Sequence, residues 1–287
     1  MASISIIGSG FVGQTQGKYL EGLGHDVSYY DISETALKRF SKSKRKETVL
    51  HAVTSTEASF ICVPTPFNNG FDASIIKSIF SDIAKAIPLK QSQHLIVVKS
   101  TVLPGTTEKL LLPLLLKNVP SDEARICVNP EFVTEISSTW TDDEDFLIDK
   151  GNEGRIVIGA LNKESGEWLK QIYSKDMAEV FLTDLKTAEM TKYAANCMLA
   201  VKISYWNEIF LICEELSIDS NEVARLTTLD SRIGEYGSIH GKAFGGKCLP
   251  KDLKSLMSLT GNIDGVGILK AANRVNDWMA EHYGVRE

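Results

Sequence analysis

A glycine-rich turn between a short strand and a helix limits the N-terminal part of this chain to few folds. An apolar run, Ser3 to Ile7, leads directly into Gly8-Ser9-Gly10-Phe11-Val12-Gly13. A helical pattern follows to about Leu23, and a second strand-like run, His25 to Tyr30, ends on Asp31. Strand, turn, helix and strand within about thirty residues have the size of a mononucleotide-binding βαβ unit.

The glycine turn predicts a dinucleotide site. Gly8 permits the tight turn, Gly10 lets the backbone approach a pyrophosphate at the helix N-terminus, and Gly13 lets helix and strand pack closely. Asp31 would accept hydrogen bonds from ribose hydroxyls, and its charge repels a 2′-phosphate, which favours NAD over NADP. A βαβ turn that binds nothing is the alternative. The predicted cofactor contacts in this unit are Gly8, Gly10, Phe11, Val12, Gly13 and Asp31.

Strand-like and helical runs continue to alternate after Asp31. The strand-like runs are Ala58 to Val63, His94 to Lys99, Arg125 to Val128 and Arg155 to Gly159. Such alternation predicts an α/β fold with a Rossmann-type, doubly wound, mostly parallel sheet. Pro64, Thr65 and Thr101 follow two of these runs, at the strand ends where ligands bind in open α/β sheets. They are predicted cofactor contacts, although a turn on its own needs similar residues.

The pattern changes near Thr183. From there to Glu215 the chain has no glycine or proline, and apolar residues recur at helical spacing. A helix of about thirty residues is long for a globular domain. It predicts the spine of an all-helical second domain, with shorter helices at about 220–226, 252–260 and 267–282. We therefore expect an NAD-binding domain over residues 1–183 and a helical catalytic and dimerisation domain over residues 184–287.

Composition and charge exclude several classes of protein. The net charge of -6 argues against a general nucleic-acid binder, and the one basic cluster, Lys42 to Lys46, is interpreted as a solvated loop or helix end. The longest apolar run, Leu110 to Leu116, is too short for a membrane span, and the N-terminus lacks the basic leader of a signal peptide. Five cysteines without metal-ligand spacing favour a reduced, cytoplasmic protein with a free thiol and no metal site.

The strongest local signal is the segment Phe244 to Asp252, FGGKCLPKD. Its two glycines make a loop in which backbone can crowd a ligand, and Pro250 suits the first turn of the helix that follows. Cys248 then lies at or just before a helix N-terminus and close to two lysines, where positive potential favours the reactive thiolate. Asp252 lies one turn further on. The alternative is a buried structural cysteine in a tight turn.

Lys192 and Asn196 are four residues apart on the predicted long helix, so they share one face. Glu189 precedes Lys192 on nearly the same side, and the rest of that flank is apolar. A lysine in an apolar stripe is usually a surface residue that extends its ammonium into solvent. A catalytic role for Lys192 is the second interpretation.

With all these segments in place, the chain resembles the UDP-glucose/GDP-mannose dehydrogenase family from Ser3 to about Asn276. The motifs occur in the family's order: GSGFVG, CVPTP, STVLPGTT, NPEFVTE, RIVIG, AEMTKYAANCMLAVKISYWNE, DSRIG and FGGKCLPKD. The resemblance implies two successive hydride transfers to NAD, which take the primary alcohol of a nucleotide-sugar through an aldehyde to the uronic acid.

The resemblance also implies roles for single residues. Cys248 matches the nucleophile that traps the aldehyde as a thiohemiacetal, whose oxidation gives a thioester that water hydrolyses. Lys192 matches the lysine that stabilises the developing oxyanion, and Asn196 matches its hydrogen-bonding partner. Asp252 matches an aspartate that assists proton transfer, and Glu131 matches the glutamate assigned to thioester hydrolysis.

Other matched positions concern the cofactor, the substrate and the assembly. Thr101 matches a threonine near the nicotinamide and a water, Lys251 a lysine near the cofactor phosphates, and Glu135 a second acid of the NPEF loop that is also expected near the cofactor. Arg232 matches an arginine that reaches the neighbouring subunit's substrate site, which implies a homodimer built around the long helix. The expected substrate contacts are Glu131, Phe132, Glu135, Lys192, Asn196, Arg232 and Gly245.

The chain departs from the family pattern at its C-terminal side. Family members usually continue into a third domain, itself Rossmann-like, which holds much of the nucleotide and has no counterpart before Glu287. Ile136 also replaces a glycine that often follows the second glutamate of the NPEF loop. The chain is then a short form for a smaller substrate, a fragment, or one of two polypeptides of which the other supplies the missing domain.

Two other functions compete with this prediction. A 3-hydroxyacid dehydrogenase of the 6-phosphogluconate type has a Rossmann domain, a helical domain and a catalytic lysine, but it makes one oxidation and has no catalytic cysteine. A non-catalytic NAD-binding regulatory or assembly protein would explain the short chain. The FGGKCLPKD segment argues against the first, and the full set of catalytic residues argues against the second.

Overall fold

The fold is described from a computed structural model, which describes residues 1–68, 70–132, 154–261 and 263–286. The chain divides into two compact units. Among the described residues, the first unit contains residues 1–66, 72–132 and 154–192, and the second contains 67–68, 70–71, 193–261 and 263–286. The predicted boundary after residue 183 stays a prediction.

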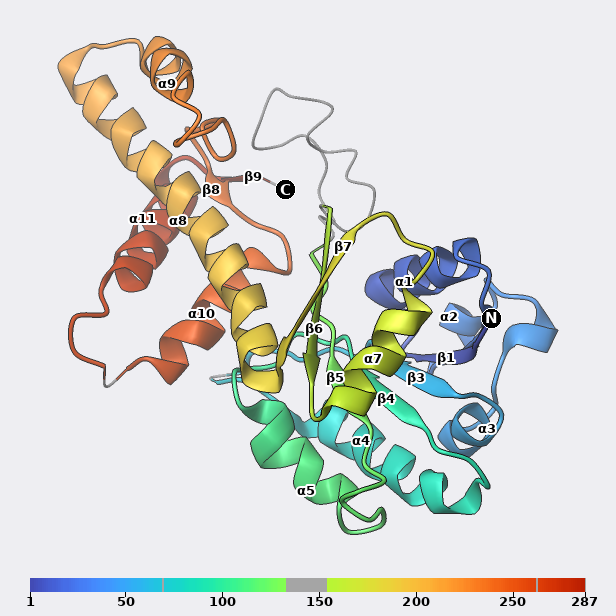
Figure 1. The fold of residues 1–287 in the computed structure, drawn as a ribbon. Helices are drawn as coiled ribbons and strands as arrows, with labels where there is room; N and C mark the ends of the chain where they lie inside the picture. The colour runs from blue at the N-terminus through green and yellow to red at the C-terminus, as the bar shows by residue number, and fades with distance from the viewer. Residues whose placement is uncertain (69, 133–153, 262, 287) are drawn as a thin grey trace. The chain divides into compact units, whose positions relative to one another are not determined.

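The first unit is built on a seven-stranded sheet in the order β2-β1-β3-β4-β5-β6-β7 (Figure 1). The first five strands of this order are parallel, β6 pairs antiparallel with β5, and β7 is parallel to β6. The strands are β1 (Ser3–Ile7), β2 (Asp26–Tyr30), β3 (Ala58–Ile61), β4 (Leu95–Val98), β5 (Ile126–Val128), β6 (Arg155–Ala160) and β7 (Glu179–Asp184). The predicted α/β fold with a Rossmann-type, mostly parallel sheet is confirmed.

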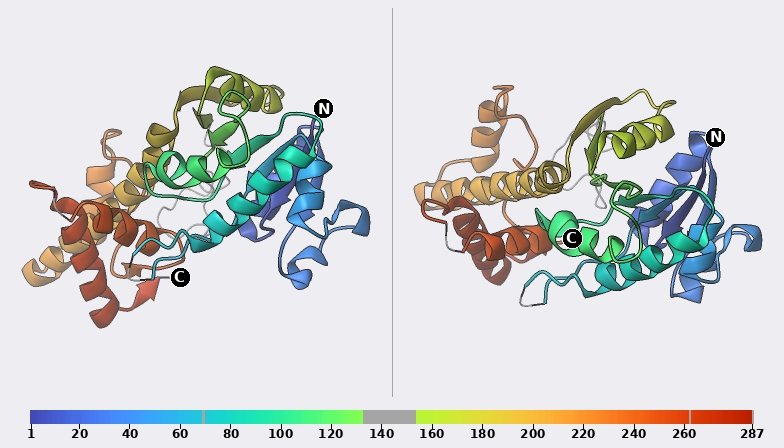
Figure 2. Two further views of the ribbon diagram at one scale, coloured as in Figure 1. Left: turned by 90° about the horizontal axis from the view of Figure 1, so that it is seen from below. Right: turned by 60° about the horizontal axis from the view of Figure 1, so that its bottom comes forward.

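Helices cover both faces of this sheet (Figure 2), which explains why its central strands are continuously buried. On one face, α1 (Phe11–Gly22) and α7 (Lys163–Ile172) pack on a core that alternate strand residues such as Ile4, Ile6 and Phe60 supply. The other helices of the unit are α2 (Glu34–Leu37), α3 (Val49–Thr54), α4 (Ser74–Ala86) and α5 (Leu112–Leu115), with single turns at η1 (Lys42–Lys44), η2 (Ile87–Leu89) and η3 (Thr107–Leu111).

Several elements of the first unit had no sequence prediction, namely β7 and the helices α2, α3 and α7. In β7 the side chains are mostly exposed or half-buried, including Phe181 and Leu182. This strand lies at the edge of the sheet and pairs with β6 alone. Apolar side chains therefore alternate less clearly along β7 than along the buried strands, and periodicity gave no signal.

The second unit is helical apart from β8 (Ala243–Phe244) and β9 (Val285–Arg286), which pair in parallel. Its spine is α8 (Leu185–Leu216), a helix of 32 residues that starts in the first unit. The other helices are α9 (Ser220–Thr228), α10 (Leu249–Leu259) and α11 (Ile268–His282). The predicted long helix is confirmed. Among the residues that the structure describes, no helix is long and apolar enough to cross a membrane.

Candidate active site

The glycine turn after β1 has the geometry that a dinucleotide needs. Gly8 has φ +96°, and a Cβ there would lie 2.7 Å from the carbonyl oxygen of Cys62. A Cβ on Gly13 would lie 1.9 Å from the carbonyl oxygen of Gly8, so only glycine allows this close packing of α1. At Gly10, the N-cap of α1, a Cβ would meet nothing within 4 Å, and no side chain caps the helix. The first turn of α1 therefore fits a pyrophosphate.

Asp31 is tied to this turn. Its Oδ2 accepts a hydrogen bond of 2.6 Å from the amide of Ser9, and its Oδ1 accepts one of 2.8 Å from the amide of Ser33. The carboxylate thus lies beside the glycine turn, where its remaining lone pairs suit ribose hydroxyls. Phe11 is exposed and Val12 half-buried in the same turn.

The turns after β3 and β4 are joined by hydrogen bonds. Thr65 Oγ1 donates to the carbonyl of Thr101 at 2.6 Å, and Ser100 Oγ donates to the carbonyl of Val63 at 2.7 Å. Pro64 lies between these contacts along the chain. The structure thus brings the predicted residues of the two strand ends together, at the same edge of the sheet as the glycine turn.

A buried polar cluster lies at the same edge, behind the predicted residues. Lys99 is only 2% exposed, and its ammonium donates to Asn129 Oδ1 and lies 3.0 Å from Glu131 Oε2. Tyr173 donates to Asn129 Oδ1 at 2.7 Å. Glu131 was predicted from the sequence, whereas Lys99, Asn129 and Tyr173 were not. The lysine at the end of an apolar strand was the available signal, because a charged residue there needs a buried partner.

Lys192 is buried, and its ammonium lies 5.4 Å from the centre of the Phe132 ring. The guanidinium of Arg155 lies 4.9 Å from the same centre. Both are cation–π distances, so the first unit places the predicted Phe132 and Lys192 side by side. The interpretation of Lys192 as a solvent-extended surface residue is wrong, since the side chain is buried.

Glu189 lies one turn before Lys192 and binds the loop after β4. Its carboxylate accepts hydrogen bonds from the amides of Gly105 and Thr107. Burial raises the pKa of this carboxyl, although these hydrogen bonds act in the opposite direction. Glu189 therefore fixes the start of α8 to the STVLPGTT loop.

In the second unit, Asp252 is 1% exposed and has two polar partners. Asn196 Nδ2 donates to its Oδ2 at 2.6 Å, and Lys251 Nζ donates to its Oδ1 at 2.7 Å. The structure thus brings three predicted residues together, with Lys251 directed to Asp252. The predicted contact of Lys251 with cofactor phosphates stays a prediction.

Cys248 is the N-cap residue of α10, as the sequence predicted, and α10 already begins at Leu249. Its side chain is exposed, whereas the other four cysteines are buried. The alternative of a buried structural cysteine is therefore wrong. Gly246 has φ +74°, and a Cβ on Gly245 would lie 2.6 Å from Val285 Cγ1 of β9, so both glycines of the loop are needed.

One predicted residue, Arg232, stands apart from these clusters. Arg232 is on the surface and pairs with Asp230 at 2.6 Å. Glu135 lies outside the described residues. Within the described part of the chain, no group of three or more His, Cys, Asp or Glu residues could hold a metal ion.

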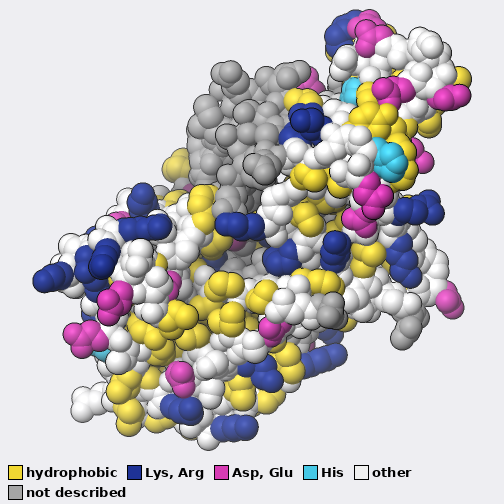
Figure 3. Space-filling view, turned by 180° about the vertical axis from the view of Figure 1, so that it is seen from behind, with side chains coloured by type: hydrophobic (Ala, Val, Ile, Leu, Met, Phe, Trp, Pro, Cys, Tyr) yellow, Lys and Arg dark blue, Asp and Glu magenta, His cyan; other side chains and the backbone are white. Residues whose placement is uncertain are grey.

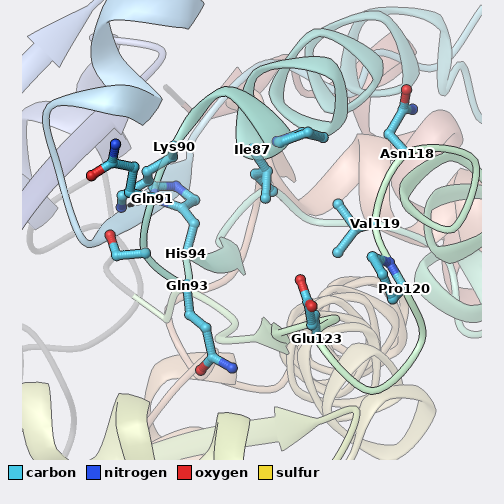
Figure 4. Close-up of a pocket in the computed structure, with 11 residues that line it drawn as sticks. Ile87, Lys90, Gln91, Gln93, His94, Asn118, Val119, Pro120 and Glu123 are labelled. Carbon is cyan, nitrogen blue, oxygen red and sulfur yellow. Dashed lines mark hydrogen bonds between the residues drawn. The ribbon is translucent and has the colours of Figure 1, made fainter.

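A cavity of about 460 Å³ lies at the opposite edge of the sheet (Figure 4). Its lining includes Lys90, His94 and Glu123, and it contains no predicted site residue. On the face drawn in Figure 3, Lys and Arg side chains are scattered among hydrophobic and acidic ones. In the predicted basic cluster, Lys44 pairs with Glu21 at 2.8 Å. We call the edge of the sheet at the carboxyl ends of its parallel strands, where the glycine turn, Thr65 and Thr101 lie, the carboxyl edge. The cavity and the basic cluster contain no predicted site residue, so the carboxyl edge is the candidate site of this unit.

Comparison with known proteins decides the family. Residues 40–176 match the NAD binding domain of the UDP-glucose/GDP-mannose dehydrogenase family, and residues 186–278 match its central domain. A solved UDP-glucose dehydrogenase from Pyrobaculum islandicum has a TM-score of 0.87 and 33% identity, over 98% of this chain and 69% of that one. The chain belongs to the UDP-glucose/GDP-mannose dehydrogenase family. The prediction that NAD is the cofactor is thereby confirmed.

Members of the family with both substrate names are similarly close in sequence. The GDP-mannose 6-dehydrogenase of Pseudomonas syringae pv. tomato is 33% identical over 91% of this chain and 64% of its own length. The UDP-glucose 6-dehydrogenase of Rickettsia conorii is 34% identical over 96% of this chain and 66% of its own length. The chain thus spans a little under two thirds of these relatives. The glycine turn at residues 8–13 precedes the matched domain range, so its assignment depends on the geometry above.

Proposed function

We propose that this chain catalyses the NAD-dependent, four-electron oxidation of the primary alcohol of a nucleotide-sugar, such as UDP-glucose, to the uronic acid. The observation that carries the proposal is the state of Cys248. It is the exposed cysteine, it caps the N-terminus of α10, and the buried carboxylate of Asp252 follows it by one turn. A two-electron hydroxyacid dehydrogenase needs no such thiol.

The residues at the carboxyl edge of the sheet would hold the cofactor. Bound NAD supplies the hydride acceptor for both oxidations. The first turn of α1 from Gly10 onward would hold its pyrophosphate, and Asp31 would hold the adenosine ribose. Thr65 and Thr101, whose turns are hydrogen-bonded to each other, would border the nicotinamide end.

Cys248 would act as the nucleophile between the two oxidations. The positive end of the α10 dipole favours its thiolate, which is the reactive form. The thiolate sulfur attacks the carbonyl carbon of the aldehyde, and a C–S bond forms to give a thiohemiacetal. The second hydride leaves this adduct and produces a thioester. Water then attacks the acyl carbon, the C–S bond breaks, and the acid leaves the regenerated thiolate.

The buried polar residues would handle charge and protons in these steps. Lys192, buried on α8, would stabilise negative charge on the substrate oxygen, with Asn196 one turn further along the same helix. Asp252 is aimed by its hydrogen bonds from Asn196 and Lys251, so it can receive a proton without reorienting. Glu131 would assist the hydrolytic water.

The number of NADH formed per substrate consumed tests the reaction. UDP-glucose and GDP-mannose are the first substrates, followed by simple hydroxy acids. We expect two NADH per sugar nucleotide, and Cys248→Ser should abolish acid formation while leaving NAD binding intact. One NADH per substrate would support the hydroxyacid dehydrogenase, and unchanged acid formation by Cys248→Ser would exclude the covalent route.

Alkylation with iodoacetamide tests the thiol without any substrate. Cys248 should react well below the pH at which ordinary thiols react, and before the four buried cysteines. Mass spectrometry of peptides after short exposures locates the modified residue. A Cys248 that is no faster than the others would support a binding protein rather than an enzyme.

The proposed assembly is a homodimer through α8. Apolar side chains on this helix are exposed at helical spacing, among them Met198, Tyr205 and Ile212. Arg232 is also exposed, as a residue that serves a neighbouring subunit must be. Sedimentation velocity measures the assembly. Tyr205→Glu should shift the protein to monomers, and the exposed Lys254→Glu on α10 is the matched control.

A further inference from the structure

Lys99 is an unusual residue for its position. It follows the last residue of β4, and its side chain is 2% exposed. A lysine ammonium is almost never fully buried unless it is paired, because desolvation of a charge is costly. Its two recorded partners are Asn129 Oδ1 and Glu131 Oε2, each at 3.0 Å. The side chain therefore serves the segment that carries Glu131.

The carboxylate of Glu131 is held at both oxygens. Lys99 lies at Oε2, and the amide of Phe132 donates to Oε1 at 3.0 Å. Each carboxylate oxygen can accept two hydrogen bonds. These two donors fix the direction of the carboxylate.

The ammonium of Lys99 is itself held by a chain of hydrogen bonds. Asn129 accepts from Lys99 and also from Tyr173, and its Nδ2 donates to the carbonyl of Val157 on β6. Tyr173 in turn accepts from Gln16 of α1 at 3.0 Å. Hydrogen bonds to β6 and α1, and the residues that follow β5 and α7, thus hold Asn129 beside the ammonium of Lys99, which also lies 3.0 Å from Glu131.

Among the described residues, Cys62 and Tyr173 lie close enough to sense the charge of Glu131, and both stay uncharged at neutral pH. Burial raises the pKa of Cys62, at the end of β3, to about 12. Burial also raises the pKa of Tyr173 well above its usual value, and the Glu131 charge adds to this. The carboxylate of Glu131 is itself buried, and a cation in contact with it offsets the cost of removing that charge from water. Lys99 supplies that cation.

We propose that Lys99 is a positioning residue that keeps Glu131 ionised and oriented toward the water that hydrolyses the acyl–enzyme. This inference rests on the proposed function of Cys248 and Glu131. In the step, the water oxygen bonds to the acyl carbon while the C–S bond breaks and the sulfur leaves as thiolate. The proton of the water passes to Glu131.

Infrared difference spectroscopy tests the charge state without any substrate. The spectrum of each protein is compared at neutral pH with that of the same protein carrying Glu131→Gln, which isolates the bands of Glu131. The wild-type chain and Lys99→Arg should show carboxylate bands. Lys99→Met should show the carbonyl stretch of a protonated carboxyl group. If the methionine variant does not fold, Lys99→Gln takes its place, because glutamine keeps a hydrogen-bond donor without the charge. Carboxylate bands in the uncharged variants would overturn the proposal.

Intact-mass spectrometry after rapid mixing with NAD and UDP-glucose or GDP-mannose tests the hydrolytic step. Lys99→Met should accumulate an acyl adduct on Cys248 and release it about 10²-fold more slowly than the wild type, as expected for a displaced catalytic group. Lys99→Arg should restore most of the rate. Lys90→Met is the matched control, since the ammonium of Lys90 lies beside His94 at the amino end of β4, and it should release acid like the wild type.

The outcomes separate the two proposals. An adduct that Glu131→Gln retains but Lys99→Met releases at the wild-type rate would overturn the role of Lys99 alone. If the wild-type chain forms neither adduct nor NADH with either sugar nucleotide, the proposed function fails. The infrared comparison then still decides whether Lys99 sets the charge of Glu131.

Discussion

Strand β4 has a buried polar cluster at each of its ends, and the two clusters differ in charge. At the amino end, His94 Nε2 lies 2.8 Å from Ser59 Oγ, and its Nδ1 lies 3.2 Å from both the carbonyl oxygen of Thr56 and the ammonium of Lys90. Both ring nitrogens therefore have partners. Burial first, and Lys90 second, lower the pKa of His94 to about 3, so the ring is neutral.

At the carboxyl end, the cluster contains charge. Lys99 and Glu131 form a buried ion pair, and the amide of Phe132 donates to the other oxygen of the carboxylate. This end also lies at the strand edge that carries the glycine turn, Thr65 and Thr101. A neutral cluster whose polar atoms are paired stabilises a fold, whereas a charged cluster beside ligand-binding turns can take part in chemistry.

The comparison also shows that a cavity by itself is weak evidence for a functional site. The 460 Å³ cavity of Figure 4 lies at the amino end, beside His94 and Lys90. In open α/β sheets, ligands bind outside the carboxyl ends of the strands, where the turns vary freely and helix N-termini point at the ligand. The chemistry of the groups at an edge therefore identifies the site better than the empty volume does.

Paired substitutions at the two ends should produce the largest difference. Glu131→Gln removes the proton acceptor and should lower the rate of acid formation by roughly 10²- to 10⁴-fold. Lys90→Met removes a half-buried lysine that binds the carbonyl of Thr56 and should leave that rate within about twofold, as for a residue that is outside the reaction. Steady-state assays of acid formation measure both. Equal losses at the two ends would mean that both clusters act only on stability.

The sequence predicted several elements of the fold well because their signals are local. The glycine turn and Asp31 have a fixed spacing along the chain, and so do the apolar residues of α8 that recur at helical spacing. Backbone geometry alone decides the positions of such residues. Cys248 was placed at a helix N-terminus for the same reason, since Pro250 marks the first turn. The confirmed parts of the prediction are therefore those in which neighbours in sequence are neighbours in space.

The rest of the site depends on contacts between distant segments. Lys99 meets Glu131 across thirty-odd residues and Tyr173 meets Asn129 at a separation of 44 residues. The hydrophobic periodicity of a sequence does not indicate which buried residues of distant segments contact each other. The burial of Lys192 was missed for the same reason. Its ammonium lies beside Phe132, far away in sequence, and the residue statistics for lysine on a helix favour the surface.

A second pair of substitutions tests whether each glycine of the turn after β1 is needed for helix packing or for NAD binding. Gly13→Ala puts a Cβ 1.9 Å from the carbonyl oxygen of Gly8, so α1 must shift, and we expect a loss of roughly 1–3 kcal/mol in the free energy of unfolding. Gly10→Ala meets nothing within 4 Å and should leave that free energy nearly unchanged, yet weaken NAD by crowding the pyrophosphate. Urea unfolding and NAD titration calorimetry measure the two effects. Unimpaired NAD binding by Gly10→Ala would argue against this turn as the pyrophosphate site.

The smallest effect concerns the amino end alone and its response to acid. The pKa of His94 is about 3 in the folded chain and about 6.5 in an unfolded one. Between these values the unfolded chain binds a proton that the folded chain does not, so the free energy of unfolding falls as the pH falls from about 6.5 toward 3. His94→Gln removes this contribution, and its stability should fall less steeply, by at most about 1.4 kcal/mol per pH unit. Urea unfolding between neutral pH and mildly acid pH measures both slopes, with the exposed His51→Gln as the matched control. If His94→Gln and the wild type have the same slope, the ring accepts a proton in the folded chain, and the amino-end cluster is not the neutral structural element that distinguishes it from Lys99 and Glu131.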